Sequence, residues 1–122
     1  MENTSVKTYK DLIVWQRAME LVVEIYALTE QFPREEIYGL TSQMRRAAVS
    51  IPSNIAEGRS RGTKKDYRQF LIMAYSSGAE LETQVEIAKR LLFVKKISYN
   101  KVDSLLQEVM KMLNKMILTL GA

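Results

Sequence analysis

Apolar residues recur at alternating steps of three and four along most of this chain, the spacing expected for one buried face of an α-helix. The first such segment runs from Tyr9 to about Gln31. Its repeating positions are Leu12, Trp15, Met19, Val22, Val23 and Tyr26. Phe32-Pro33 should end this helix, because the residue before a proline is disfavoured in the α conformation.

Three further segments show the same spacing. The second repeats at Leu40, Met44, Ala47 or Ala48, Ile51 and Ile55, with Gly58 and Gly62 marking its end. The third should begin at a Thr63 cap with Asp66 in the capping-box position. Its buried face is predicted to hold Tyr67, Phe70, Leu71, Ala74, Leu81, Val85, Ala88 and Leu92. The fourth, with Ser98 as its cap, repeats at Val102, Leu105, Val109, Met112 and Met116.

Signals for β-strands are absent, since the chain has no Asn-Gly or Asp-Gly hairpin and no sustained alternation of period two. Turns are predicted near 32–37, 58–63 and 94–98, and such short connections make successive helices antiparallel. The expected fold is therefore all-α, an antiparallel up-down-up-down four-helix bundle over residues 9–122, preceded by a loose N-terminal tail at 1–8. Pro52 lies inside the second helix and predicts a bend, with a functional hinge as the alternative.

The composition excludes several kinds of site. The 122 residues include no cysteine and no histidine, which removes disulfides, thiolate chemistry, the commonest general base and the commonest zinc ligand. No nucleophile–base pair, phosphate-cradling glycine loop or metal motif is present, so we expect a protein that is not an enzyme and has no cofactor. The first residues contain no apolar signal core, and no apolar run is long enough to span a membrane. We expect a cytoplasmic protein without a membrane partner.

Positive charge is concentrated between the second and third predicted helices. Seven of the 18 basic residues fall between positions 45 and 68, where only Glu57 and Asp66 oppose them, so this segment carries about +5. The seven are Arg45, Arg46, Arg59, Arg61, Lys64, Lys65 and Arg68. The natural partner of such a segment is a polyanion. Only Tyr67 is interleaved among these residues, so binding should be directed at the nucleic-acid backbone. A solvated turn and ion pairing between subunits are the alternatives.

Polar residues also share helical faces on the second and third helices. We predict a hydrogen-bonded network that crosses the bundle or a subunit interface and contains Ser50, Asn54, Glu57, Ser77, Glu80 and Gln84. A magnesium site built from oxygen ligands, or acid–base chemistry by Glu57 and Glu80, are the alternatives. Bundles that bind two metal ions use Glu-x-x-His motifs, and this chain has no histidine. Arg45 or Arg46 could instead point inward and pair with Glu80 or Glu82.

Several motifs resemble one known family. They are Tyr9-Lys10-Asp11-Leu12-Ile13-Val14-Trp15-Gln16, Phe32-Pro33, Tyr38-Gly39-Leu40-Thr41-Ser42-Gln43, the block from Arg45 to Gly58 with Ser50-Ile51-Pro52-Ser53-Asn54-Ile55-Ala56-Glu57-Gly58, and Glu80-Leu81-Glu82-Thr83-Gln84. Over nearly its whole length the chain resembles the four-helix-bundle proteins encoded in bacterial 23S rRNA intervening sequences. The resemblance implies a four-helix bundle that assembles as a ring-like homopentamer. The chain is also similar to the accessory bundle proteins of diversity-generating retroelements, which are basic pentamers that work with a reverse transcriptase and RNA.

Two classes of function follow. The first is a non-catalytic, oligomeric protein that binds the backbone of RNA, or of DNA, through the basic helix–turn–helix junction. The second is a structural or adaptor bundle that docks a protein partner without binding nucleic acid. Independently of the resemblance, a bundle this rich in apolar residues should have surplus apolar surface to bury between subunits.

Overall fold

The computed structural model describes residues 6–91 and 97–121. Within these ranges the chain forms helices and turns and no strand. The elements are the short 3-10 helix η2 (Tyr9–Asp11), α1 (Ile13–Thr29), the short 3-10 helix η3 (Arg34–Glu36), α2 (Leu40–Arg59), α3 (Lys64–Leu91) and α4 (Asn100–Leu120).

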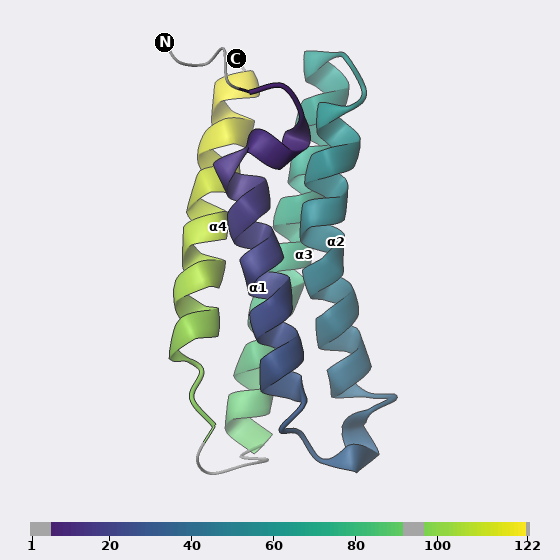
Figure 1. The fold of residues 1–122 in the computed structure, drawn as a ribbon, viewed down its shortest axis with the longest axis vertical. Coiled ribbons are helices and arrows are strands. Elements are labelled where there is room, and N and C mark those ends of the chain that lie inside the picture. Colours follow the sequence, from purple (N-terminus) through teal and green to yellow (C-terminus); the bar gives the residue numbers. More distant parts are fainter. Residues whose placement is uncertain (1–5, 92–96, 122) are drawn as a thin grey trace.

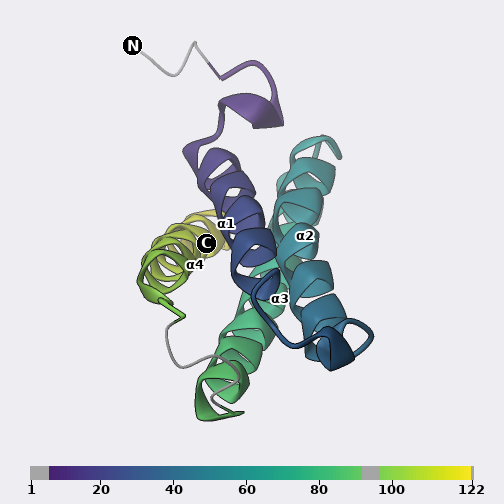
Figure 2. The same ribbon diagram turned by 60° about the horizontal axis from the view of Figure 1, so that its bottom comes forward.

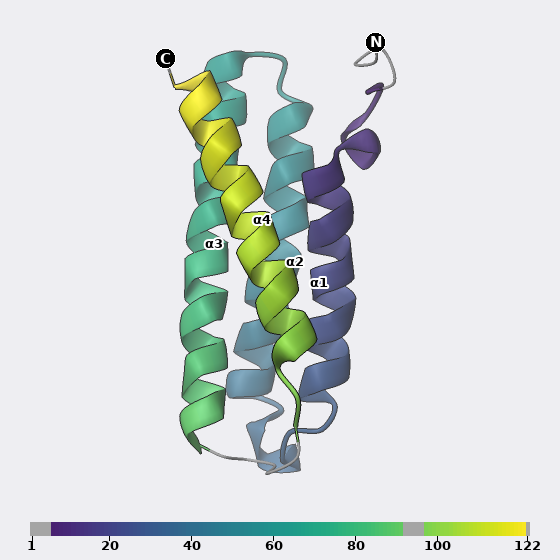
Figure 3. The ribbon, with the colours of Figure 1, turned by 90° about the vertical axis from the view of Figure 1, so that its left-hand side faces the viewer.

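The four long helices form an antiparallel bundle in which each runs opposite to its neighbour in the sequence (Figure 1). Each helix packs against the next one along the chain, and α1 closes the bundle by packing against α4. The α2–α3 pair has the most extensive contact. Views from the lower end and from the side show the same arrangement (Figures 2 and 3). The predicted all-α, up-down-up-down four-helix bundle is confirmed.

Helix α2 has the buried face that its sequence predicts. Its buried residues are Leu40, Thr41, Met44, Ala47, Ala48, Ile51, Pro52, Ile55 and Gly58. The helix continues through Pro52 without interruption. A proline has no N–H to donate to the carbonyl four residues before it, here that of Ala48. The next two carbonyls of that turn also accept side-chain hydrogen bonds. Ser53 Oγ donates to the Val49 carbonyl and Asn54 Nδ2 to the Ser50 carbonyl, both at 2.8 Å. The expected bend, and the hinge alternative, stay predictions.

Helix α1 buries a different face from the one predicted. The core positions are Val14, Ala18, Leu21, Ile25 and Leu28. The predicted stripe instead lies outside the core: Met19, Val23 and Tyr26 are 40, 63 and 43% exposed, and Leu12, Trp15 and Val22 are only partly buried. The prediction was wrong because α1 carries two apolar stripes, and their spacing is the same. Only the position of α1 against the other helices decides which stripe faces the core.

The ends of α1 and α4 differ slightly from prediction. A helix from Tyr9 was expected, but Thr8 and Asp11 form a capping box around η2, and Leu12 is extended, so α1 starts at Ile13. This helix ends at Thr29 rather than near Gln31. The cap of α4 is one residue later than expected.

At the start of α4 the N-cap residue is Tyr99, although Ser98 Oγ still accepts a 3.4 Å hydrogen bond from the Asn100 N–H. Thr63 does cap α3, because its Oγ1 accepts a 3.1 Å bond from the Asp66 N–H.

The buried faces of α3 and α4 follow the predicted spacing. Leu71, Ala74, Leu81, Val85 and Ala88 lie in the core from α3, as do Val102, Leu105 and Val109 from α4. Tyr67, Met112 and Met116 are partly buried and pack against this core. Gly58 lets α2 approach α3 closely, since a Cβ at this position would lie 2.7 Å from the Cβ of Phe70.

Three predictions involve residues outside the described part of the chain. These are most of the tail at 1–8, most of the turn at 94–98, and the core position of Leu92. Among the helices that the structure does describe, none has the length and apolar character needed to cross a membrane.

Candidate nucleic-acid interface

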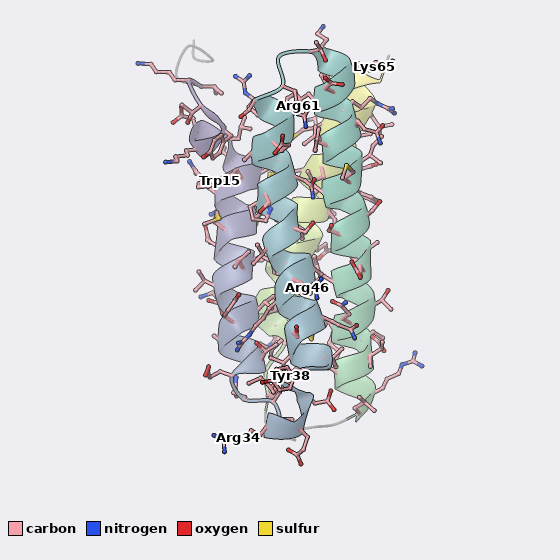
Figure 4. The ribbon with its side chains drawn as sticks, turned by 90° about the vertical axis from the view of Figure 1, so that its right-hand side faces the viewer. Trp15, Arg34, Tyr38, Arg46, Arg61 and Lys65 are labelled. Atoms are coloured by element: carbon pink, nitrogen blue, oxygen red, sulfur yellow. The ribbon has the colours of Figure 1, made fainter. Side chains whose placement is uncertain are left out.

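The α2–α3 junction gathers four of the predicted basic residues at one end of the bundle. Helix α2 ends at Arg59 and α3 begins at Lys64, and Gly62 makes the turn between them with a φ of 91°, a conformation that favours glycine. Arg59, Arg61, Lys64 and Lys65 are all exposed. Arg61 and Lys65 lie close to the turn at the top of the bundle (Figure 4). We call these four residues the junction cluster.

The members of the junction cluster differ in how firmly they are held. Arg61 forms an ion pair with Glu57, with 3.0 Å between Nη2 and Oε2, and its guanidinium lies 4.8 Å from the centre of the Phe70 ring. Within the part of the chain that the structure describes, Arg59, Lys64 and Lys65 have no ion pair. Three cations at the junction are therefore free to contact an anion, whereas the Arg61 guanidinium is held in place by Glu57 and Phe70.

Two lysines of the cluster lie where a helix disfavours positive charge. Lys64 and Lys65 open α3, and the N-terminus of a helix carries partial positive charge, so each costs a few tenths of a kcal/mol. Arg59, at the C-terminal end of α2, has the favourable position.

Nearby, burial raises the pKa of Tyr67, while the positive charge of Arg59 acts in the opposite direction. The Tyr67 hydroxyl is therefore neutral at physiological pH.

Arg68 lies beside the junction cluster but is used within the fold. Its Nε donates a 3.1 Å hydrogen bond to the carbonyl of Ile117 in the last turn of α4. The carbonyls at a helix C-terminus lack partners within the helix and carry partial negative charge, so a guanidinium stabilises them. Arg68 thus joins the start of α3 to the end of α4.

Arg45 lies apart from the junction cluster. Its Nε donates to Thr29 Oγ1 at 2.8 Å, its guanidinium lies 4.5 Å from the centre of the Tyr26 ring, and it pairs with Glu30 at 3.8 Å. Arg45 does pair with a carboxylate, but with Glu30 just after the end of α1 rather than with the predicted Glu80 or Glu82. These contacts attach α2 to the end of α1.

Arg46 also lies apart, at mid-height on the bundle (Figure 4). It is exposed, and it lines a shallow cleft of about 420 Å³ between α2 and α3 together with Gln43, Ala47, Ser50, Ser77 and Glu80. The seven predicted basic residues therefore divide into the junction cluster, Arg68 beside it, and two arginines elsewhere.

The predicted polar network forms in part. Ser50 Oγ and Ser77 Oγ are 2.8 Å apart across the α2–α3 interface, and Asn54 Nδ2 donates to Ser50 Oγ at 2.9 Å. Glu57 instead pairs with Arg61, and Glu80 is exposed at the rim of the cleft. Gln84 is 5% exposed, and its buried Oε1 has no hydrogen-bond partner among the residues that the structure describes.

No cluster of three or more acidic side chains that could hold a metal ion occurs among the described residues.

Three lysines that the sequence reasoning missed lie at the same end of the bundle. Lys7 and Lys10 belong to the segment before α1, and Lys115 lies in the last two turns of α4. The sequence did carry the signal, because an up-down-up-down bundle places the start of its first helix and the end of its fourth beside the second connection. Charge was counted along the sequence, where these residues are far from the junction.

A family model described as 23S rRNA-intervening sequence protein matches residues 10–115 of the chain. No curated protein matches it significantly.

Proposed function

The chain belongs to the 23S rRNA-intervening sequence protein family, and on this premise we propose that it is a non-catalytic protein that binds the RNA backbone through its junction cluster. A role connected with ribosomal RNA is what the family suggests. A cytoplasmic location and action as a homo-oligomer are parts of the same proposal.

The observation that supports this proposal is the state of Arg59, Lys64 and Lys65. All three are exposed, and none is paired with a carboxylate within the described chain. Two of them occupy a helix N-terminus, where positive charge is unfavourable. Charge kept at such a position without an internal partner favours an external anion. Arginine and lysine at a protein surface contact phosphates without reading base sequence.

The test replaces the junction cluster by glutamine in one variant, Arg59→Gln, Arg61→Gln, Lys64→Gln and Lys65→Gln. RNA binding is measured at several salt concentrations by fluorescence anisotropy. Each phosphate contact contributes roughly 0.7–0.9 to the slope of log affinity against log salt. Removing the cluster should therefore reduce the slope by roughly two to four, and binding should weaken across all sequences.

A matched control removes the same number of charges from the opposite end, with Arg34, Lys89, Arg90 and Lys101 changed to glutamine. This variant should keep the wild-type salt slope. If the wild-type protein shows no salt-sensitive binding to RNA or DNA, the proposed function fails. The structural or adaptor function, in which the bundle docks a protein partner, then replaces it.

We further propose that the partner of the outer α1 face is a second copy of the chain. This face consists of Trp15, Met19, Val22, Val23 and Tyr26. Next to it is a cleft of about 560 Å³ between α1 and α2, where Tyr26, Ile37 and Val49 are all more than 40% exposed. Exposed apolar side chains gathered on one face mark interaction sites. The resemblance to ring-forming proteins favours five subunits.

Light scattering tests this self-association. The wild-type mass should be at least twice the 14.1 kDa of one chain. Val23→Glu should lower this mass, because a charge buried in an interface is costly. Thr83→Glu, at an exposed position on α3, should leave the mass unchanged. A wild-type monomer at micromolar concentration would instead favour the same cleft as the docking site of a different protein.

A further inference from the structure

The bundle end that carries the junction cluster has a larger basic surface than the junction alone. Because the helices alternate in direction, the start of α1, the α2–α3 turn and the end of α4 lie together at this end (Figures 1 and 3). The described residues there include eight basic and three acidic side chains, about +5 in total. The basic ones are Lys7, Lys10, Arg59, Arg61, Lys64, Lys65, Arg68 and Lys115. We call this surface the basic end.

Among the described residues, the acidic side chains of the basic end form no ion pair with its lysines. Asp11 accepts backbone N–H bonds from Lys7 and Thr8, and these bonds lower the pKa of its carboxyl. Glu57 is paired with Arg61. The described residues at the opposite end include five basic and seven acidic side chains. Among the described residues, positive charge is therefore concentrated at the basic end.

The basic charges are spread in a way that suits two rows of phosphates. They come from three separate segments around the end of the bundle. Neighbouring helix axes in a bundle are about 8–10 Å apart, so the end is roughly 20 Å across. The phosphates bordering a groove of a double helix lie on two strands, across a gap of about 6–12 Å in B-form DNA. A single strand offers only one row.

The basic end also lacks the side chains that bind single strands. Proteins that bind single-stranded nucleic acids stack the bases on exposed aromatic rings. Among the described residues, the exposed large aromatic side chains are Tyr26, Tyr38 and Tyr75, on other parts of the bundle. At the basic end, Tyr9 packs edge-on against Trp15, with ring centres 5.5 Å apart.

The other two aromatic rings near the basic end are also engaged. Tyr67 packs against the core and Arg61 lies over the ring of Phe70. The four rings described at this end are thus only partly exposed, and each already has a packing partner, which makes this end a poor platform for stacking bases.

We infer that the ligand of the basic end is a double helix, gripped across a groove by the junction cluster together with Lys7, Lys10 and Lys115. This inference rests on the proposed function and specifies its ligand. The backbone of duplex RNA and that of duplex DNA share the required phosphate chemistry. The protein reads shape and charge, and it discriminates against single strands of equal length.

The experiment compares three probes of equal length at the same salt concentration: a duplex RNA, a duplex DNA and an unstructured single-stranded RNA. Wild-type protein should bind at least one duplex about tenfold or more tightly than the single strand. The triple variant Lys7→Gln, Lys10→Gln and Lys115→Gln should lower the salt slope for that duplex by roughly two to three. Its effect on the single strand should be smaller.

The matched control changes Arg34, Arg90 and Lys101 to glutamine, which removes the same charge from the opposite end. This control should bind the duplex as the wild type does. Equal or tighter binding of the single strand would overturn the inference while leaving the proposed function intact, and so would a triple variant that behaves like the control. Absence of binding to all three probes would overturn both. The preferred duplex identifies which backbone is the ligand.

Discussion

Helices α2 and α3 approach each other closely at Gly58, directly below the junction cluster. We predict that Gly58→Ala destabilises the protein even though alanine is the better helix former. A Cβ at this position would lie 2.7 Å from Phe70 Cβ and 3.2 Å from the Tyr67 carbonyl oxygen. One of these atoms is backbone and the other is the first carbon of a side chain. Neither can rotate away, so the two helices must separate.

The magnitude follows from two opposing effects. Carbon atoms pack best about 3.5–4.0 Å apart, so relieving the contact with Phe70 requires a shift of roughly 1 Å. Overpacking a core position typically costs about 1–3 kcal/mol. Because neither contacting atom can rotate away, the upper part of that range applies. The higher helix propensity of alanine returns about 1 kcal/mol. The free energy of unfolding should fall by about 1–2 kcal/mol.

Urea denaturation followed by far-ultraviolet circular dichroism measures this change, at one fixed protein concentration because self-association would alter the stability. The midpoint should fall by roughly 0.5–1.5 M without a change in slope. Gly78→Ala is the matched control. A Cβ there would fall on the Met110 sulfur, and the flexible methionine can move, so the loss should be smaller. A Gly58→Ala variant as stable as wild type would refute the close-packing argument.

Three further predictions concern contacts elsewhere in the fold. Ser50→Ala and Ser77→Ala should each cost about 1 kcal/mol, and a double-mutant cycle should give a coupling of about 0.5–1.5 kcal/mol; strict additivity would mean that the hydroxyls do not interact. The pKa of the Asp11 carboxyl, measured by NMR, should lie below 3.8, because the carboxylate accepts backbone N–H bonds. The stability that these bonds give the fold is then present above pH 3.8 and is lost as the pH falls through the lowered pKa. A measured pKa at or above 3.8 would contradict this prediction. Arg45→Ala should lower the free energy of unfolding by about 1–2 kcal/mol yet leave the salt slope of RNA binding unchanged, and a reduced slope would place Arg45 in the nucleic-acid interface.

The existence of the four long helices and most core positions of α2, α3 and α4 could be predicted from local signals. The apolar spacing of α2 identifies a single face that can be buried, because the opposite face holds polar residues such as Arg46 and Ser53. Helix α1 has two apolar stripes, so its sequence alone could not say which one enters the core. Only packing against α2 and α4 selects the face that contains Leu21 and Ile25.

The candidate interface was predictable where its residues are consecutive. The junction cluster is a local feature of the sequence, and the structure keeps its four members together at one turn. Arg45 and Arg68 were grouped with it by sequence distance alone. Their partners, Thr29 and the Ile117 carbonyl, are 16 and 49 residues away. Contacts over such distances depend on which helices become neighbours, and a charge count along the sequence does not contain that information.

The placement of both described chain ends at the basic end has a practical consequence for anyone who studies this protein. A purification tag or fluorescent group placed next to either described end, Val6 or Gly121, would lie near the basic end and obstruct the proposed ligand. The opposite end offers a better site. Tyr38 is 95% exposed there (Figure 4), and the chain has no cysteine. Tyr38→Cys would therefore give a single reactive thiol for a dye or for immobilisation, with the basic end left open to solution.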